Sequence, residues 1–225
     1  MRTYGQYCAV AKALDVIGDR WTLLIVRELL LRGPSRYTDV RDGLPGVATN
    51  LLSDRLRALE DAGLVLREKA PPPIAATLFR LTARGEELRT VVDEVGRWGI
   101  PVMAHGPEEG DEFRSHWLAF PARLNLIDRE PSRAPVTIEV RTGGGAFLIE
   151  TAEGSVTTRP GSVDEPDAVL TGPPHPIAGL LAGRLALAAA LASGVSCDGD
   201  PDAVRRVLPD VARRVSGAPV RSSGN

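Results

Sequence analysis

The sequence is poor in cysteine, histidine, lysine and aromatic side chains. Its only cysteines among 225 residues are Cys8 and Cys197, which argues against a disulfide scaffold and is compatible with the cytoplasm. The three histidines share no metal-ligand spacing, and the motifs of zinc hydrolases, serine hydrolases and phosphate-binding loops are missing. We therefore expect no bound metal, no cofactor and no enzymatic activity.

Long apolar runs are also scarce. The first seven residues contain no apolar core of a signal peptide, so we predict no secretory signal. The one long apolar run, residues 176–195, is rich in alanine and glycine and is interrupted by Arg184, which favours buried helices over a membrane span. The expected location is cytoplasmic, without a membrane partner.

Positive charge comes almost entirely from arginine, because Lys12 and Lys69 are the only lysines. Residues 1–100 hold 15 Lys+Arg against 13 Asp+Glu, a net of +2, and residues 101–225 hold 12 against 16, a net of −4. This asymmetry is too mild for a basic tail, so any DNA affinity must come from individually placed residues. The length favours two domains.

Residues 35–63 carry the pattern of two short helices joined by a Gly/Pro turn at 42–46. The second helix is expected at 48–62 and ends at Gly63, a natural left-handed stop. Its apolar stripe is Leu52, Leu56 and Leu59, and its opposite face carries Asn50, Ser53, Arg57 and Asp61. Such a helix fits a DNA major groove, where Asn pairs with adenine and Arg with guanine. The alternative is an ordinary amphipathic helix pair.

Two helices are predicted before this segment and a hairpin after it. The first helix spans 8–17, and the second spans 20–31 with Asp19 as its cap. The apolar face expected on the second helix consists of Trp21, Leu24, Ile25, Leu29 and Leu30. Strands at 64–69 and 77–81 flank a proline-rich loop at 70–76. This order is that of a winged helix, in which the hairpin, or wing, lies along the phosphate backbone. Arg67 and Lys69 would then contact phosphates, and the alternative for both is a solvated strand edge.

A long helix is expected from the cap residue Thr82 to about residue 103. Its apolar stripe consists of Leu88, Val91, Val92, Val95 and Trp98. This helix either closes the core or pairs with its copy in a second subunit. Because DNA sites read by such modules are usually two-fold symmetric, a homodimer is favoured.

The N-terminal segments together resemble the HxlR-type winged helix–turn–helix transcriptional regulators. The resemblance covers about residues 4–98 and rests on motifs that agree in order and spacing. These are Tyr7-Cys8, the run 14–25 (LDVIGDRWTLLI), Arg36-Tyr37, Leu52-x-x-Arg55-Leu56-x-x-Leu59-x-x-x-Gly63-Leu64-Val65, Phe79-x-Leu81-Thr82-x-x-Gly85 and Trp98. The resemblance implies dimeric, sequence-specific binding to a double-stranded DNA operator, with dimer contacts on the first and last helices of the domain.

Taken together, these observations predict DNA contacts from seven residues. They are Arg36, Thr49, Asn50, Ser53, Arg57, Arg67 and Lys69. Cys8 stands where a number of such regulators keep a redox-active cysteine, and its place at a helix start favours a reactive thiolate. The alternative for Cys8 is a small apolar packing residue.

The C-terminal half alternates strands and then turns helical. Residues 105–112 are polar and contain Gly and Pro, as a linker does. A helix with large apolar anchors is expected at 112–128, then strands at 136–141, 146–151, 155–159 and 167–171, and helices at 176–182, 185–193 and from 201 onward. The triple glycine at 143–145 separates two strands, so it predicts a hairpin turn rather than a dinucleotide-binding loop.

Several of these features resemble the sterol carrier protein type 2 fold. They are the strand run, the segment 164–171 (DEPDAVLT), the helix at 180–183 and the segment 195–200 (VSCDGD). The resemblance implies a sheet backed by helices around a cavity for lipophilic molecules; the alternative is a plain α/β core. The residues expected to contact a small lipophilic or aromatic effector are Trp117, Phe120, Leu124, Phe147, Leu180, Leu181 and Leu187.

The predicted fold class is α+β. A winged helix–turn–helix domain (1–104) precedes a linker (105–112), a sterol-carrier-like α/β domain with an antiparallel-rich sheet and an apolar cavity (113–216), and a disordered tail (217–225). The predicted function is transcriptional regulation, as a repressor whose operator binding responds to an effector in the second domain. Two alternatives remain. One is an oxidant- or electrophile-sensing regulator acting through Cys8, and the other is a lipid or polyketide carrier or enzyme in which the winged helix only dimerises.

Overall fold

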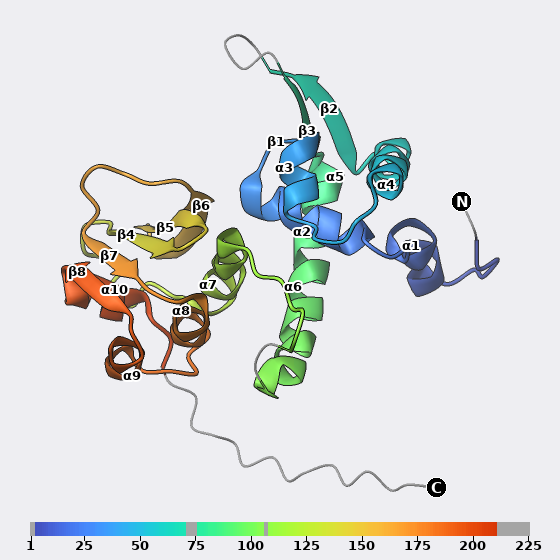
Figure 1. Ribbon diagram of the computed structural model, residues 1–225. Helices are drawn as coiled ribbons and strands as arrows, with labels where there is room; N and C mark the ends of the chain where they lie inside the picture. The colour runs from blue at the N-terminus through green and yellow to red at the C-terminus, as the bar shows by residue number, and fades with distance from the viewer. Residues whose placement is uncertain (1–2, 71–75, 106–107, 211–225) are drawn as a thin grey trace, which may run out of the picture. The chain divides into compact units, whose positions relative to one another are not determined.

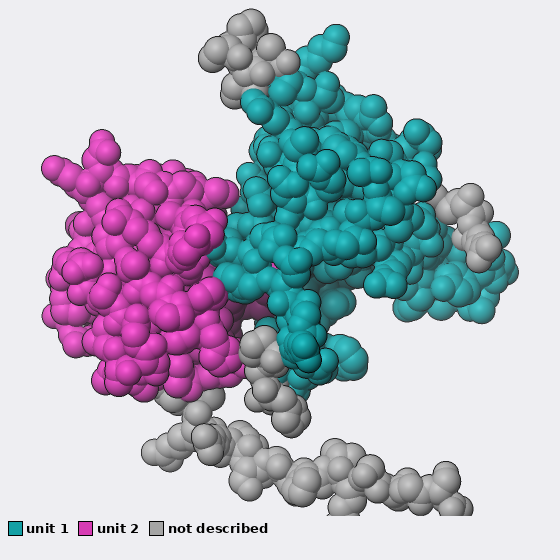
Figure 2. Space-filling model, viewed as in Figure 1, with its two compact units in different colours: residues 1–116 teal, residues 117–225 magenta. Residues whose placement is uncertain are grey.

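The computed structural model of the chain describes residues 3–70, 76–105 and 108–210. The chain divides into two compact units, residues 1–116 and 117–225 (Figure 2). The division falls after His116, a few residues beyond the expected domain start at 113. The predicted tail, 217–225, and the centre of the predicted wing loop, 71–75, lie outside the described residues.

The first unit is a winged helix–turn–helix fold (Figure 1). Its elements are α1 (Ala9–Ile17), α2 (Thr22–Arg32), β1 (Ser35–Arg36), α3 (Tyr37–Asp42), α4 (Thr49–Asp61), β2 (Val65–Lys69), β3 (Thr77–Leu81), α5 (Ala83–Glu86), α6 (Leu88–Gly99) and the 3₁₀ helix η1 (Ile100–His105). The strands form an antiparallel sheet in the order β1-β3-β2, in which Ser35 lies opposite Phe79 and Val65 opposite Leu81. The expected helix pair and hairpin are both present.

Helix α2 lies at the centre of this unit, where it contacts α3, α4, α6 and β3. Ile25, Val26 and Leu29 are at most 2% exposed, and Leu31 is also buried. Because neighbours surround α2 on several sides, its buried surface is wider than one amphipathic stripe. Leu24, expected in the apolar face, is exposed instead.

The start of α2 differs from the expectation. Trp21, not Asp19, is the N-cap residue, and its backbone takes the left-handed φ of 79°. The Asp19 carboxylate instead accepts a hydrogen bond from Arg55 Nη1 on α4, at 2.5 Å. The predicted cap is therefore wrong, because a partner 36 residues away in the sequence engages this carboxylate.

The long helix predicted after Thr82 is divided into three parts. The Thr82 hydroxyl accepts the hydrogen bond of the Gly85 amide and caps the short helix α5 as expected. A break at Glu87 separates α5 from α6, and the last turns at 100–105 are 3₁₀ in form. Val92 is buried in the unit, whereas Val95 and Trp98 of the predicted stripe are exposed.

The second unit is a mixed sheet with helices (Figure 1). Its elements are α7 (Ala119–Asn125), β4 (Thr137–Thr142), β5 (Gly145–Ala152), β6 (Ser155–Pro160), β7 (Ala168–Thr171), α8 (Pro174–Leu181), α9 (Leu187–Ala192), β8 (Ser196–Gly199) and α10 (Pro201–Val207). The 3₁₀ turn η2 (Ser115–Leu118) spans the division, with Ser115 and His116 in the first unit. The strand order is β6-β5-β4-β7-β8. Only β4 and β7 pair in parallel, and the other neighbours are antiparallel.

The central strands of the second unit are buried on both faces, since β4 and β5 each bury three consecutive residues. Ile138, Val140, Phe147 and Ile149 on β4 and β5 are fully buried, together with Leu170 on β7. Helix α7 packs on β5 and β6, and α10 packs on β4 and β7. A bidentate ion pair of Arg206 with Asp128, at 2.7 and 2.8 Å, fastens α10 to the segment before the sheet.

The first helix of the second unit is shorter than the sequence predicts, and the last helix begins where it is expected. The helix predicted at 112–128 is confined to 119–125, and Phe113, one of the large apolar residues within the predicted range, is exposed. Pro121 falls in the first turn of α7, where a missing amide costs no helical hydrogen bond. The helix predicted from 201 onward is confirmed at α10, which Asp200 caps by accepting a hydrogen bond from the Asp202 amide.

Within the described ranges, no helix is long and apolar enough to cross a bilayer. The same ranges contain no cluster of three or more His, Cys, Asp or Glu side chains arranged to hold a metal ion.

Candidate DNA-binding site

Helix α4 separates its leucines from its polar side chains as the sequence predicts. Leu52, Leu56 and Leu59 are at most 2% exposed and fasten the helix to the core. The helix ends at Asp61, and Gly63 follows with a left-handed φ of 69°, in open space. The face opposite the leucines is therefore free of core packing within the first unit.

The first turn of α4 carries three of the predicted DNA contacts. Thr49 and Asn50 are exposed, and Ser53 is half-buried. The Tyr37 hydroxyl donates to the Thr49 carbonyl at 2.8 Å, and the Ser53 hydroxyl donates to the same carbonyl at 3.0 Å. The Tyr37 bond ties α3 to the start of α4, so Tyr37, quoted above only within the Arg36-Tyr37 motif, is a positioning residue.

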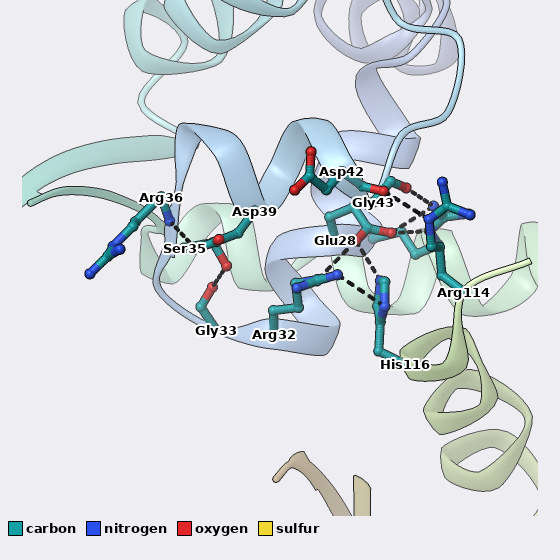
Figure 3. Close-up of polar contacts among 11 residues, drawn as sticks. Glu28, Arg32, Gly33, Ser35, Arg36, Asp39, Asp42, Gly43, Arg114 and His116 are labelled. Carbon is teal, nitrogen blue, oxygen red and sulfur yellow. Dashed lines mark hydrogen bonds and ion pairs between the residues drawn. The ribbon is translucent and has the colours of Figure 1, made fainter. Parts of the chain in front are cut away.

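Arg57 and Arg36 provide exposed guanidinium groups on α4 and before α3. The Arg57 side chain is 65% exposed, and it forms an ion pair of 3.4 Å with the equally exposed Asp54. Arg36 is exposed at the start of α3, where its backbone amide donates to Asp39 at 2.9 Å (Figure 3). Both side chains are placed to meet an anionic or base-edge partner without rearranging the core.

The two basic residues of the wing differ in their surroundings. Arg67 pairs with Glu60 of α4, at 2.7 Å from Nη2, and its guanidinium lies over the Phe79 ring at 5.2 Å. Lys69 at the end of β2 is exposed. Lys69 can contact a phosphate without a rearrangement, whereas Arg67 would have to give up its contacts with Glu60 and Phe79.

Arg55 and Asp19 form a second connection that holds α4. Arg55 lies on α4 and bonds Asp19, in the turn between α1 and α2. Two adjoining hollows of about 670 and 200 Å³ border this pair, and Asp15 lines both of them. Sequence spacing offers no sign of this pair, since its members belong to different elements.

A buried carboxylate lies behind the turn of the helix–turn–helix. Glu28 on α2 is 0% exposed and accepts a hydrogen bond from Arg27. It also accepts hydrogen bonds from Arg32 and His116 (Figure 3). Burial raises the pKa of this carboxyl, but the His116 hydrogen bond and the Arg27 charge outweigh it, so the pKa lies below its usual range. The sequence signal was a single acid among apolar residues, with arginines one position before and four after it.

Cys8 has the environment of a reactive thiol. It is exposed and directly precedes α1, and the backbone amides of Ala11 and Val10 lower its pKa. Cys197 on β8 contrasts with it, because burial, followed by the charge of Asp198, raises the pKa of that thiol.

The seven predicted effector contacts are distributed over α7, η2, the sheet and two helices of the second unit. Phe147, Leu180, Leu181 and Leu187 are buried, and Trp117, Phe120 and Leu124 are half-buried. Effector binding by these residues stays a prediction, as does the sterol-carrier-like identity of the fold.

Comparison with known proteins places the first unit in a family. The HxlR-like helix-turn-helix family matches residues 16–106. YvaP, an uncharacterized HTH-type transcriptional regulator of Bacillus subtilis, is 34% identical over 87 residues, which are 39% of this chain and 80% of that protein. The uncharacterized HTH-type transcriptional regulator Rv3095 of Mycobacterium tuberculosis is 35% identical over 119 residues, 53% of this chain and 74% of its own. The structure of reduced YodB from B. subtilis is 27% identical, covers 45% of this chain and 100% of YodB, and has a TM-score of 0.39.

The relatives are HTH transcriptional regulators, and the matched residues contain the helix–turn–helix, the wing and the exposed face of α4. Through residues 16–106, the chain belongs to the HxlR-like helix-turn-helix family of DNA-binding transcriptional regulators.

Proposed function

We propose that the protein is a sequence-specific repressor that reads its operator with α4. The observation that carries this proposal is the two-sided character of α4: its leucines are buried, and Asn50 and Arg57 point away from the core. An exposed Asn and an exposed Arg on one helix provide the side chains that pair with adenine and guanine edges. Arg36 and Lys69 would add phosphate contacts on either side of the helix.

We propose further that the active form is a homodimer. Large apolar side chains are exposed on the N-terminal segment and α1, and again on α6 and η1. They are Tyr4, Tyr7, Val10, Leu14, Val91, Val95, Trp98, Val102 and Met103. So much exposed apolar surface on these segments favours a protein–protein contact. A second copy of the same surface supplies an apolar partner and a two-fold operator arrangement.

Operator selection followed by quantitative binding tests the proposal. Wild-type protein selects duplexes from a random-sequence library, and its affinity for the selected duplex is compared with that for a scrambled duplex at the same salt concentration. A repressor of this kind prefers the selected duplex by roughly 10³-fold or more. A promoter fusion of the selected site to a reporter gives the sign of regulation. Equal affinity for both duplexes would contradict base reading.

The second unit is proposed to bind a small lipophilic or aromatic effector that alters operator affinity. Support comes from the apolar side chains of η2, α7 and α8, of which Trp117 and Phe120 are only half-buried. Trp117 is the one tryptophan of this unit, so its emission reports a ligand locally. Titration with 1-anilinonaphthalene-8-sulfonate would quench Trp117 emission in wild type. A response that persists in a Trp117→Phe variant would place the probe elsewhere.

A redox role for Cys8 is the second candidate. The exposed thiol with a lowered pKa at a helix start favours oxidation by peroxides or reaction with electrophiles. Operator binding of wild type and Cys8→Ser, with and without diamide or hydrogen peroxide, tests this role, with Cys197→Ser as the matched control. An unchanged response in Cys8→Ser would remove it.

A further inference from the structure

The Glu28 carboxylate, on α2, packs against the turn between α3 and α4. A Cβ placed on Gly43, the first residue of this turn, would collide with Glu28 Oε2, so the glycine allows the carboxylate to lie against the backbone. Arg27 joins the two sides, since its Nη2 bonds Glu28 Oε1 at 2.6 Å and the Gly43 carbonyl at 3.2 Å. The position of the turn therefore depends on how this buried charge is satisfied.

The chain returns to the same carboxylate 88 residues later. His116 Nε2 lies 2.7 Å from Glu28 Oε2, and Arg32 Nη2 lies 3.1 Å from His116 Nδ1 (Figure 3). A guanidinium only donates, so Nδ1 must accept and Nε2 must carry the proton that the carboxylate accepts. His116 Nε2 is therefore the donor in this contact, and Glu28 Oε2 is the acceptor.

Arg114 adds a second attachment to the same turn. Its Nε donates to the Asp42 carbonyl at 3.0 Å, at the end of α3 (Figure 3). Arg114 is thus bonded to Asp42 at the end of α3, and His116 is bonded to Glu28 on α2. We call residues 114–116 the latch.

The latch lies outside the shared family domain. The family match ends at residue 106, whereas the latch occupies the last three residues of the first unit, and Trp117 begins the second. The latch, which leads directly into the second unit, is thus hydrogen-bonded to Asp42 and Glu28, next to the turn that precedes α4. Residue 117 is covalently joined to the latch, and the latch reaches Glu28 and Asp42 through hydrogen bonds.

We propose that the latch couples the state of the second unit to operator affinity; this inference rests on the proposed function. Withdrawing the latch removes the His116 donor from the buried Glu28 carboxylate. This loss destabilises the folded state unless the neighbouring cations rearrange. Arg27 is the neighbour that also holds the Gly43 carbonyl. Its rearrangement loosens the turn that orients α4, and binding to DNA must then restore that order. A ligand that favours the withdrawn arrangement lowers operator affinity to the extent of that preference.

The test uses the full-length chain and the duplex selected by wild type. His116→Ala removes the donor to Glu28, His116→Gln supplies an amide that donates and accepts in its place, and Arg114→Ala removes the second attachment. His175→Ala is the matched control, since His175 is exposed on α8 of the second unit. Two measurements are made on each variant: the affinity for the selected and scrambled duplexes, and amide hydrogen exchange over residues 43–48.

His116→Ala and Arg114→Ala should each weaken binding to the selected duplex by at least about five-fold, the lower range of allosteric couplings. Exchange at residues 43–48 should become faster in both. His116→Gln should restore both readouts toward wild type, and His175→Ala should change neither. Rescue by glutamine distinguishes the proposed positioning role from a general loss of packing.

Wild-type affinity and exchange in all three latch variants would overturn the coupling while leaving DNA recognition intact. Faster exchange across the whole first unit, without rescue by glutamine, would also overturn it, because the defect would then be global. If wild type itself fails to prefer the selected duplex, the proposed function fails first. The two failures are therefore distinguishable.

Discussion

Arg57→Ala is expected to reduce operator affinity without weakening the fold. The side chain is 65% exposed, and its 3.4 Å ion pair with Asp54 is of the exposed kind that contributes about 0–1 kcal/mol. A bidentate contact between arginine and guanine contributes roughly 1–3 kcal/mol of discrimination. Because each 1.4 kcal/mol is about a tenfold change, the operator Kd should rise about 5- to 150-fold.

Fluorescence anisotropy with the selected and scrambled duplexes, at one fixed salt concentration, measures this effect. Arg89→Ala is the matched control: Arg89 lies on α6, is 39% exposed and forms an ion pair with Glu86. The affinity ratio between the two duplexes should fall in Arg57→Ala and remain unchanged in Arg89→Ala. If Arg57→Ala weakens both duplexes equally, Arg57 contacts phosphate and the assignment of base reading is refuted. A matching loss of thermal stability would show instead that the fold needs this side chain.

Four further outcomes are expected. Lys69→Ala should weaken selected and scrambled duplexes alike and reduce the slope of log K against log salt by about 1; an unchanged slope would place Lys69 away from phosphate. Leu56→Ala, at a side chain that is 1% exposed, should lower the free energy of unfolding by roughly 2–5 kcal/mol in a denaturant titration, and a loss under about 1 kcal/mol would contradict tight packing under α4. Trp98→Ser should shift the protein from dimer to monomer in sedimentation equilibrium with little change in far-UV dichroism, whereas an unaltered dimer would locate the contact elsewhere. Glu28 has a lowered pKa in the folded state, so its ionised form contributes stability above the unfolded pKa of about 4.3 and loses it as the pH falls through the folded value; acid titration of Glu28→Gln should therefore show a shallower loss of stability, and identical profiles would argue against this assignment.

The helix–turn–helix was predictable because its rules are local. Three leucines at helical spacing, a glycine just past the helix end and a proline-rich loop between two predicted strands each specify their own element. The burial of Leu52, Leu56 and Leu59 and the left-handed backbone at Gly63 confirm that part of the interpretation. The strands of the second unit were likewise close to their predicted places, since alternation and glycine turns act over a few residues.

The errors have a common cause, which is competition from partners distant in the sequence. The Asp19 carboxylate accepts a hydrogen bond from Arg55 instead of capping α2. Leu24 is exposed, whereas other faces of α2 are buried. Phe113 did not become an anchor, because the helix that would have buried it begins six residues later. In each case a tertiary contact, or its absence, outweighed a local preference of the order of 1 kcal/mol.

The sequence by itself determined the helix–turn–helix, the approximate places of the strands and the apolar side of α4, because these depend on spacing over a few residues. Only the tertiary structure decided that Glu28, Arg27 and Gly43 meet behind the turn, and that Arg114 and His116 return to them. The physical reason is that a buried charge must be satisfied by whatever donors the fold brings within hydrogen-bond distance, and the identity of those donors is a property of the folded chain rather than of any stretch of sequence.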